Sequence, residues 1–271
     1  SLLIADWYDP GVGGHGMRDL ERGRIFRLTP EGHKGYKTPA YDFKTAKGAT
    51  EALKSPNLEA RYLAWTALHA MGKAKAGPAL ESLMSSKDSV ERARAAWCLG
   101  KMPGAGADVI ARLKKDPAAD LRIVSIRLAR QLGSGVLTLV DELSRDKNAQ
   151  VRRECAIALR EEKGAKVAPL WAALAVQHDG KDRWYLEALG IAAEGNWDAC
   201  LEAWSAAGGK WNSPGGRDII WRARSAKAPA LLAKIIKDPS TAEADKPRYM
   251  RAFDFHSGAE KDAALQSILL D

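Results

Sequence analysis

Asp88-Ser-Val-Glu-Arg-Ala-Arg-Ala-Ala-Trp-Cys-Leu99 decides the predicted fold, because the same pattern returns along the chain. An acidic turn precedes a helix-forming run, and an arginine opens that run. The arginines that open equivalent runs are Arg61, Arg92, Arg122, Arg152, Arg183, Arg217 and Arg248. Subtracting neighbouring numbers gives steps of 31, 30, 30, 31, 34 and 31 residues. A fixed period of this size is typical of a solenoid.

A first helix precedes each arginine run, so every unit is expected to hold two helices. In residues 136–146, for example, apolar residues fall three and four positions apart, as one buried helical stripe requires. Acidic residues mark the turns between paired helices, where a side-chain oxygen can accept from free backbone N–H groups: these are Asp88, Asp116, Asp146, Asp179 and Asp238. Because such pairs bury their faces only by stacking, we predict an all-α fold, a right-handed α-solenoid of about seven helix pairs over 45–271.

The amino-terminal residues depart from this period. Residues 2–5 and 23–29 are rich in β-branched and aromatic side chains, and the turn-rich segment 9–16 separates them. We therefore expect residues 1–29 to form a short β-hairpin and residues 30–44, rich in Pro, Gly and Lys, to form a linker. An isolated hairpin is marginal in water, so this one either packs on the first helices or belongs to a larger sheet.

Composition restricts the class of protein less than the repeat does. The 271 residues carry a formal net charge of +8, nearly all of it in the repeats, which favours attraction to anions. Cys98, Cys155 and Cys200 form no Cys-x-x-Cys pair, and we interpret them as small buried residues. No apolar run has the length of a membrane span, and no signal peptide opens the sequence.

The units from about Thr45 to Asp271 resemble HEAT repeats, a family of helix pairs with an acidic turn and an arginine early in the second helix. In that family the turn acid and the arginine tie neighbouring units together. The resemblance therefore implies structural roles for five of the repeat arginines: Arg61, Arg92, Arg122, Arg152 and Arg183. The match weakens after Arg183, where the segment 208–216 interrupts the pattern.

The carboxyl end resembles half a unit. Residues 261–271 match a first helix and stop at its turn acid, so the last repeat is expected to be incomplete. Capping repeats normally present a polar outer face, whereas Leu265, Ile268, Leu269 and Leu270 are apolar. We expect that the natural chain continues and that this sequence is a fragment at both ends.

Nothing in the sequence is a catalytic signature, and we assign no catalytic or cofactor-binding residue. His69, His178 and His256 lie in different repeats and form no ligand set. Gly11-Val-Gly-Gly-His-Gly16 satisfies Gly-x-Gly-x-x-Gly, but a second strand rather than an amphipathic helix follows it, so a plain loop is favoured. Asp6, Asp9 and His15 are candidate metal ligands, although ordinary turn chemistry explains them better.

Tryptophans offer the candidate ligand or partner surface. Trp184 and Trp211 are the two that we single out. Trp211 lies among glycines in 208–216, where an aromatic ring can stack on a ligand, although core or interface packing is favoured for it. Trp197 and Trp204 are seven residues apart, on one helix face, and are interpreted as core.

A second resemblance involves the amino-terminal stretch Asp6-Trp-Tyr-Asp-Pro-Gly-Val-Gly-Gly-His15, Gly23-Arg-Ile-Phe-Arg27 and the segment 51–65. Together they resemble the junction in large exported proteins of planctomycetes and related verrucomicrobial-type bacteria. In that family a propeller similar to glucose/sorbosone dehydrogenases precedes HEAT repeats and a c-type cytochrome domain. The resemblance implies that residues 1–29 are the last propeller strands, that the parent protein is periplasmic or secreted, and that the parent carries haem c. This chain lacks the propeller body and any Cys-x-x-Cys-His motif, so neither activity nor haem is assigned to it.

Three functions follow as hypotheses. The first, which we favour, is a non-catalytic scaffold that links a dehydrogenase-like propeller to a cytochrome c domain and offers its concave face to protein partners. The alternative is a basic nucleic-acid-binding protein resembling the HEAT-like alkylpurine DNA glycosylases, which requires lysines and arginines to line one face. The third, an enzyme within the repeats, requires a pocket in the tryptophan-rich stretch 184–221.

Overall fold

The computed structural model describes residues 2–6, 23–35 and 39–270. It divides into two units, Ser1–Ala40 and Tyr41–Asp271. In the first unit β1 (Leu2–Asp6) pairs antiparallel with β2 (Arg24–Leu28), and Leu2 lies opposite Leu28. The predicted hairpin is therefore present, with both strands at the expected positions.

The second unit is helical. Its α-helices are α1 (Ala46–Leu53), α2 (Leu58–Leu83), α3 (Ser89–Gly100), α4 (Gly106–Leu113), α5 (Ala119–Leu132), α6 (Val136–Leu143), α7 (Ala149–Ala158), α8 (Val167–Ala175), α9 (Arg183–Ala192), α10 (Trp197–Ala206), α11 (Pro214–Arg222), α12 (Ala228–Lys237), α13 (Lys246–Ala252) and α14 (Ala259–Leu269). Three short 3-10 helices, η1 (Leu159–Glu161), η2 (Glu243–Asp245) and η3 (Phe253–Phe255), extend α7 and flank α13.

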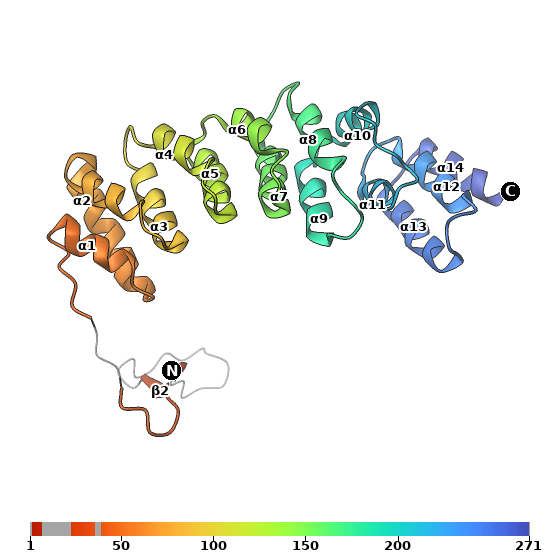
Figure 1. Cartoon of the computed structure of the whole chain (residues 1–271). Coiled ribbons are helices and arrows are strands. Elements are labelled where there is room, and N and C mark those ends of the chain that lie inside the picture. The colour runs from red at the N-terminus through yellow and green to blue at the C-terminus, as the bar shows by residue number, and fades with distance from the viewer. Residues whose placement is uncertain (1, 7–22, 36–38, 271) are drawn as a thin grey trace. The chain divides into compact units, whose positions relative to one another are not determined.

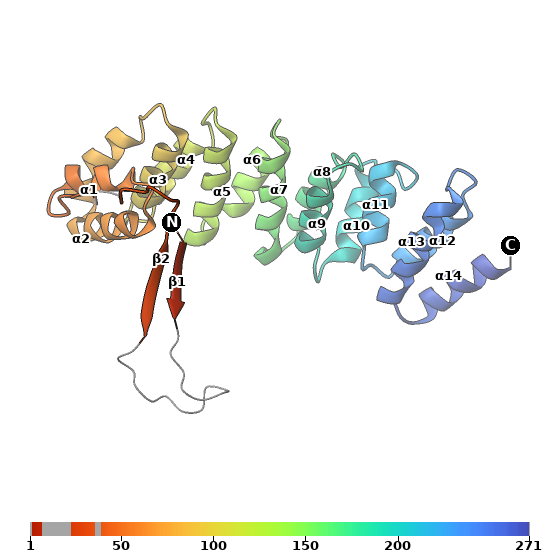
Figure 2. The same ribbon diagram turned by 90° about the horizontal axis from the view of Figure 1, so that it is seen from below.

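These helices form the predicted all-α solenoid. In Figure 1, α4, α6, α8 and α10 follow one another along the upper edge of the second unit. The second helices α3, α5, α7, α9, α11 and α13 follow one another along its lower edge, and consecutive members are in contact. Figure 2 shows the same row from below, with α14 beyond the seventh pair. Each unit therefore packs on its neighbours, as a stack of repeats requires.

The long helix α2 consists of two helices that are joined at a kink at Gly72. This glycine has φ 74° and ψ 167°, so it interrupts a continuous hydrogen-bonded run with a sharp change of direction. A left-handed φ of this kind favours glycine because it has no Cβ. The part of α2 before Gly72 is the second helix of the first unit, and the part after it is the first helix of the next.

Small and branched apolar side chains fill the space between units. Three buried clusters run along the solenoid, and their members alternate between first and second helices. Cys98, Cys155 and Cys200 are all buried within them. Burial raises the pKa of the Cys98 and Cys200 thiols to about 12, so they stay protonated and behave as small apolar groups.

The glycine-rich segment 208–216 does not break the stack; it allows two turns to touch. A Cβ on Gly215 would lie 2.0 Å from the carbonyl oxygen of His178, and a Cβ on Gly180 would lie 2.9 Å from Pro214. The turn before α9 therefore packs backbone against backbone on the start of α11. The sequence pattern weakens here because glycine contacts replace the charged contacts of earlier units.

Candidate functional site: the face of the second helices

The repeat arginines of the first four units share one contact. Each donates from Nη1 to backbone carbonyl oxygens five or six residues earlier, in the turn before its own helix. The four residues are Arg61, Arg92, Arg122 and Arg152. The guanidinium group thus binds the turn that joins the two helices of its unit.

Two of these arginines also tie neighbouring units together. Arg92 donates from Nε and Nη2 to both carboxylate oxygens of Asp116, and Arg122 does the same with Asp146, at 2.6 and 2.9 Å. Burial pushes the pKa of Asp146 up, but hydrogen bonds from Arg122 and from the Asn148 N–H outweigh it, so the pKa is lowered. Both side chains of the Arg122–Asp146 pair are largely buried, 9% and 8% exposed. Each such pair fixes the spacing of adjacent units.

The series of Arg–Asp pairs changes at the fifth unit, where a histidine takes the place of the aspartate. Asp116 and Asp146 each donate their backbone N–H to the last residue of the preceding first helix, and His178 does the same with Ala175. His178 Nε2 lies 3.1 Å from Asp218 of α11, whose other oxygen accepts from Arg248 of α13. Arg152 consequently keeps a buried Nε with no hydrogen-bond partner among the described residues.

Beyond this point the second helices carry an arginine–aromatic surface, which we define as Arg183, Trp221, Arg222, Arg224, Arg248 and Phe255. Trp221 of α11 has a guanidinium group on each side: that of Arg183 from α9 at 5.5 Å and that of Arg248 from α13 at 4.6 Å from the ring centroid. The guanidinium of Arg224 lies 4.1 Å from the Phe255 ring. Cation–π stacking thus connects three consecutive units.

Two carboxylates neutralise part of this surface. Glu187 of α9 accepts from Arg183 and from Nε of Arg222, while Asp218 is shared between His178 and Arg248. Burial pushes the pKa of Asp218 up, but hydrogen bonds from His178 and Arg248 outweigh it, and the pKa is lowered. The lowered pKa keeps Asp218 ionised at neutral pH, and both acids accept hydrogen bonds from arginines of the surface.

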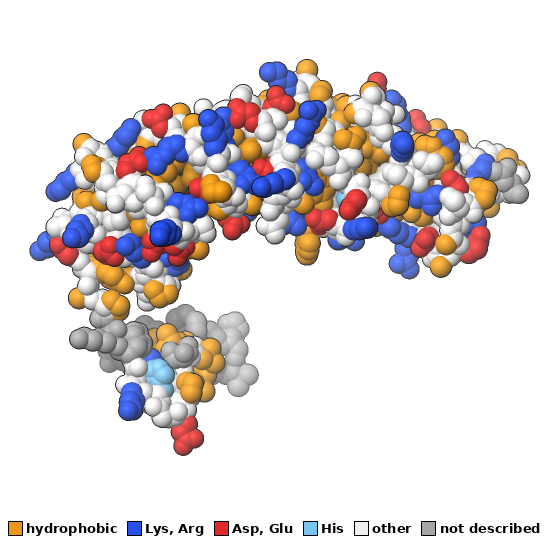
Figure 3. All heavy atoms as spheres, viewed as in Figure 1, with side chains coloured by type: hydrophobic (Ala, Val, Ile, Leu, Met, Phe, Trp, Pro, Cys, Tyr) orange, Lys and Arg blue, Asp and Glu red, His pale blue; other side chains and the backbone are white. Residues whose placement is uncertain are grey.

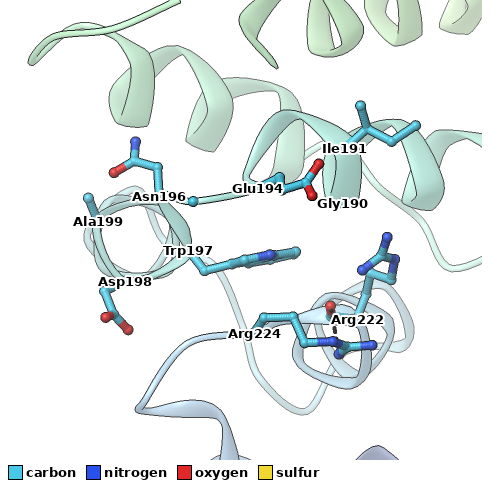
Figure 4. Close-up of a pocket in the computed structure, with 10 residues that line it drawn as sticks. Gly190, Ile191, Glu194, Asn196, Trp197, Asp198, Ala199, Arg222 and Arg224 are labelled. Atoms are coloured by element: carbon cyan, nitrogen blue, oxygen red, sulfur yellow. Dashed lines mark hydrogen bonds between the residues drawn. The ribbon is translucent and has the colours of Figure 1, made fainter. Parts of the chain in front are cut away.

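An open pocket of about 770 Å³ adjoins the surface. Figure 4 shows Trp197 directed into it from α10, with Glu194 and Gly190 on one side and Arg222 and Arg224 on the other. Asp198, at the pocket rim, already accepts from the Ser225 hydroxyl and the Ala226 N–H. Gly190 leaves room for Arg222, because a Cβ there would lie 2.6 Å from the guanidinium carbon.

Charge on this side of the solenoid is uneven. The space-filling view in Figure 3 shows blue side chains gathered along the lower edge over α11 and α13, with few red ones between them. Arg224 donates only to backbone oxygens, those of residues 221–223, and burial together with the nearby charge of Arg222 lowers its pKa. Arg251 of α13 is exposed, and the described residues place no carboxylate against it.

The structure does not bring the two singled-out tryptophans into one site. Trp184 is 72% exposed on α9. Trp211 is half-buried against the core cluster of the last units, with Lys234 Nζ 4.2 Å from its ring centroid. The pocket that Trp211 lines is formed with α12 and α14 residues and does not include Trp184.

Arg183 differs in its contacts from the other repeat arginines, because its guanidinium faces Glu187 and Trp221 rather than a turn carbonyl. Of the candidate metal ligands, Asp6 accepts from Arg24 across the hairpin, and Asp9 and His15 lie outside the described residues. Among the described residues, no group of three or more His, Cys, Asp and Glu side chains is placed to hold a metal ion. In the same part of the chain, no helix has the length and hydrophobicity of a membrane span.

Sequence reasoning missed the residues that join the last three units. His178 was read as one of several scattered histidines, yet with Asp218 and Arg248 it links the turn before α9 to α11 and α13. The sequence offered no positional signal for His178, because its neighbour Asp179 continues the series of turn acids. Trp221 stood out only as one end of the tryptophan-rich stretch 184–221, and Arg224 carried no signal, because their partners come from other repeats.

Comparison with known proteins recognises repeats in the first part of the solenoid. The family model of HEAT repeats matches residues 46–126. A crystal structure of an engineered protein is 17% identical, with a TM-score of 0.40, over 83% of this chain and 71% of that chain. No curated protein matches the sequence. HEAT repeats are therefore recognised in the first units, and the later helix pairs continue the same stack as a helical repeat scaffold.

Proposed function

We propose that this chain is a non-catalytic HEAT-repeat scaffold within a larger redox protein. In this proposal the solenoid separates a dehydrogenase-like propeller on its amino-terminal side from a c-type cytochrome domain, and its second-helix face binds protein partners. The parent protein would be periplasmic or secreted.

The observation that carries the proposal is the hairpin. The large apolar side chains of its two strands are 42–74% exposed, on both faces of the sheet, and the described residues pair no further strand with either edge: these are Leu2, Leu3, Ile4, Ile25, Phe26 and Leu28. A two-stranded sheet of this composition is marginal alone, and its open edges favour further strand pairing. In a propeller, strands at the end of a blade pair with a further strand along one edge, and neighbouring blades cover both of their faces.

Haem in the parent protein would be bound outside this chain. Covalent haem c attachment uses a Cys-x-x-Cys-His motif, which the sequence does not contain. The three cysteines are buried in separate repeats, and burial raises the pKa of their thiols. They do not fit thioether attachment.

Immunoaffinity isolation from the native source tests the proposal. An antibody raised against this chain is expected to capture a polypeptide larger than 29.4 kDa. Its tryptic peptides should include this sequence and others, and its visible spectrum should show a c-type Soret band. A colourless protein of about 29.4 kDa would contradict the proposal.

The nucleic-acid alternative has weaker support. Arg92, Arg122 and Arg217 of the repeat series are ion-paired with aspartates of the following turn, so their charge is internally compensated. A groove for duplex DNA needs uncompensated cations along its length. These three positions along the solenoid therefore offer no free cation to a phosphate backbone.

A further inference from the structure

We infer that the arginine–aromatic surface binds an acidic segment of a partner protein. This inference rests on the scaffold function proposed above and specifies the chemistry of one partner. The segment would place carboxylates against Arg224 and Arg251 and an apolar side chain in the adjoining pocket.

Arg224 is held with part of its hydrogen-bonding edge available. Ring contacts use the flat face of a guanidinium group, which leaves its N–H groups free to bind a carboxylate in the plane. Arg224 stacks on Phe255 and uses Nη1 for backbone carbonyls, so the described residues leave Nε and Nη2 without acceptors. A side chain already fixed in this way loses little entropy when it binds.

Charge on the surface remains uncompensated. Arg183, Arg222, Arg224 and Arg248 lie with two carboxylates, those of Glu187 and Asp218. Arg251 follows Arg248 by three residues, so the two are neighbours on the surface of α13. The excess positive charge therefore extends from the end of α11 onto α13, where an acidic partner has complementary charge.

The pocket provides an apolar anchor beside these cations. Trp197 and Ile191 line it together with the stems of Arg222 and Arg224 (Figure 4). A volume of about 770 Å³ accommodates a large side chain with part of its backbone. Glu194 lies on the opposite wall of the pocket, with its Oε2 3.7 Å from Nη2 of Arg160. Its negative charge would repel an acidic residue of the peptide, so the peptide's acids are restricted to the side of Arg222 and Arg224.

A peptide fits this surface better than a nucleic acid does. Phosphates recur at regular intervals along a strand, and such a strand would meet Glu187, Asp218 and Glu194 as well as the arginines. A peptide can place its acids selectively. The observations therefore favour a protein segment, and DNA binding becomes an outcome of the test.

Fluorescence anisotropy with the full 271-residue chain tests the inference. The probe is a fluorescein-labelled peptide of alternating glutamate and serine with one central leucine. The same peptide with glutamine in place of glutamate, and labelled single-stranded and duplex DNA, serve as comparison probes. The variants are Arg251→Gln and the double variant Arg224→Gln/Arg251→Gln. The control is the double variant Arg112→Gln/Arg145→Gln. It also removes two positive charges, but from α4 and from the turn that follows α6.

We expect saturable binding of the glutamate peptide. It should weaken about threefold with Arg251→Gln and at least about tenfold with the double variant. The control should stay within about twofold, because a non-specific charge effect is screened by salt. The exposed Arg251 makes no contact whose loss would unfold the chain, so this single variant keeps the test valid if Arg224→Gln disturbs the end of α11.

Absence of binding to the glutamate peptide would overturn the inference, as would equal loss in the control. Tighter binding of DNA, reduced by the same double variant, would overturn it in favour of a nucleic-acid partner. Either result leaves the mass and Soret band of the native protein unaffected, so failure here is distinguishable from failure of the proposed function.

Discussion

At the scale of single residues, the Arg122–Asp146 pair shows how a repeat signature acts. The bidentate pair crosses from one unit to the next, and a third donor of Arg122 binds the turn of its own unit. Asp146 also accepts from the Asn148 N–H, but Arg122 is the cation that is ion-paired with it. The pair therefore holds two units in one geometry.

The Arg122→Ala variant should lower the free energy of unfolding by about 3 kcal/mol, because Asp146 is left buried without its cation. Arg112→Ala is the matched control: Arg112 pairs with Glu81 between neighbouring units too, but both side chains are about half exposed. That change should cost less than about 1 kcal/mol. Urea unfolding measures both, and equal effects would contradict an inter-unit role specific to the buried pair.

Stability should depend on pH through Asp146. Its folded-state pKa is lowered, so its contribution is complete above the unfolded pKa of about 4 and is lost as the pH falls through the folded value. The Asp146→Asn variant should accordingly be less stable than the unmodified protein at neutral pH. Its free energy of unfolding should also fall less when the pH is lowered. Thermal unfolding at several pH values measures this, and parallel curves for both proteins would refute it.

The resemblance to HEAT repeats implied that turn acids and arginines tie units together, but it did not show that the series is interrupted between Arg122–Asp146 and Arg217–Asp238. His178 contacts Asp218, which lies 40 residues further along the chain, and Asp218 in turn binds Arg248, 70 residues beyond His178. No local pattern encodes contacts of that separation. The candidate surface therefore became visible only in the structure.

At the scale of elements, helix periodicity and capping residues were sufficient to predict most of the helices. The turn acids named from the sequence each accept from the backbone N–H two residues further on: these are Asp88, Asp116, Asp146, Asp179 and Asp238. The kink at Gly72 and the contact between the turns at Gly180 and Gly215 were not predictable, because both depend on backbone geometry that composition does not specify.

Gly215→Ala should lower the free energy of unfolding by about 1–3 kcal/mol, because its Cβ would lie 2.0 Å from the His178 carbonyl oxygen. Gly77→Ala is the control. Its Cβ would lie 3.8 Å from the nearest atom, a side-chain carbon of Lys73, and the helical position favours alanine by about 0.5–1 kcal/mol. Opposite shifts of the urea midpoint are expected, and an unchanged midpoint for Gly215→Ala would show that the turns do not need this contact.

At the scale of the whole molecule, the two units differ in how much of their apolar surface is buried. The solenoid places most of its large apolar side chains in three clusters, whereas every large apolar residue of the hairpin is exposed. The sequence predicted both parts, but the exposure of apolar side chains on both strand faces became visible only in the structure. The proposal of a larger parent protein therefore depends most on the hairpin.

Hydrogen exchange of the hairpin amides tests that claim most directly. In the isolated chain, residues 2–6 and 24–28 should exchange at nearly unprotected rates, because a lone exposed hairpin opens at almost no free-energy cost. In the polypeptide isolated from the native source, the same amides should be protected by at least about tenfold if they lie within a propeller sheet. Equally fast exchange in both proteins would contradict the account.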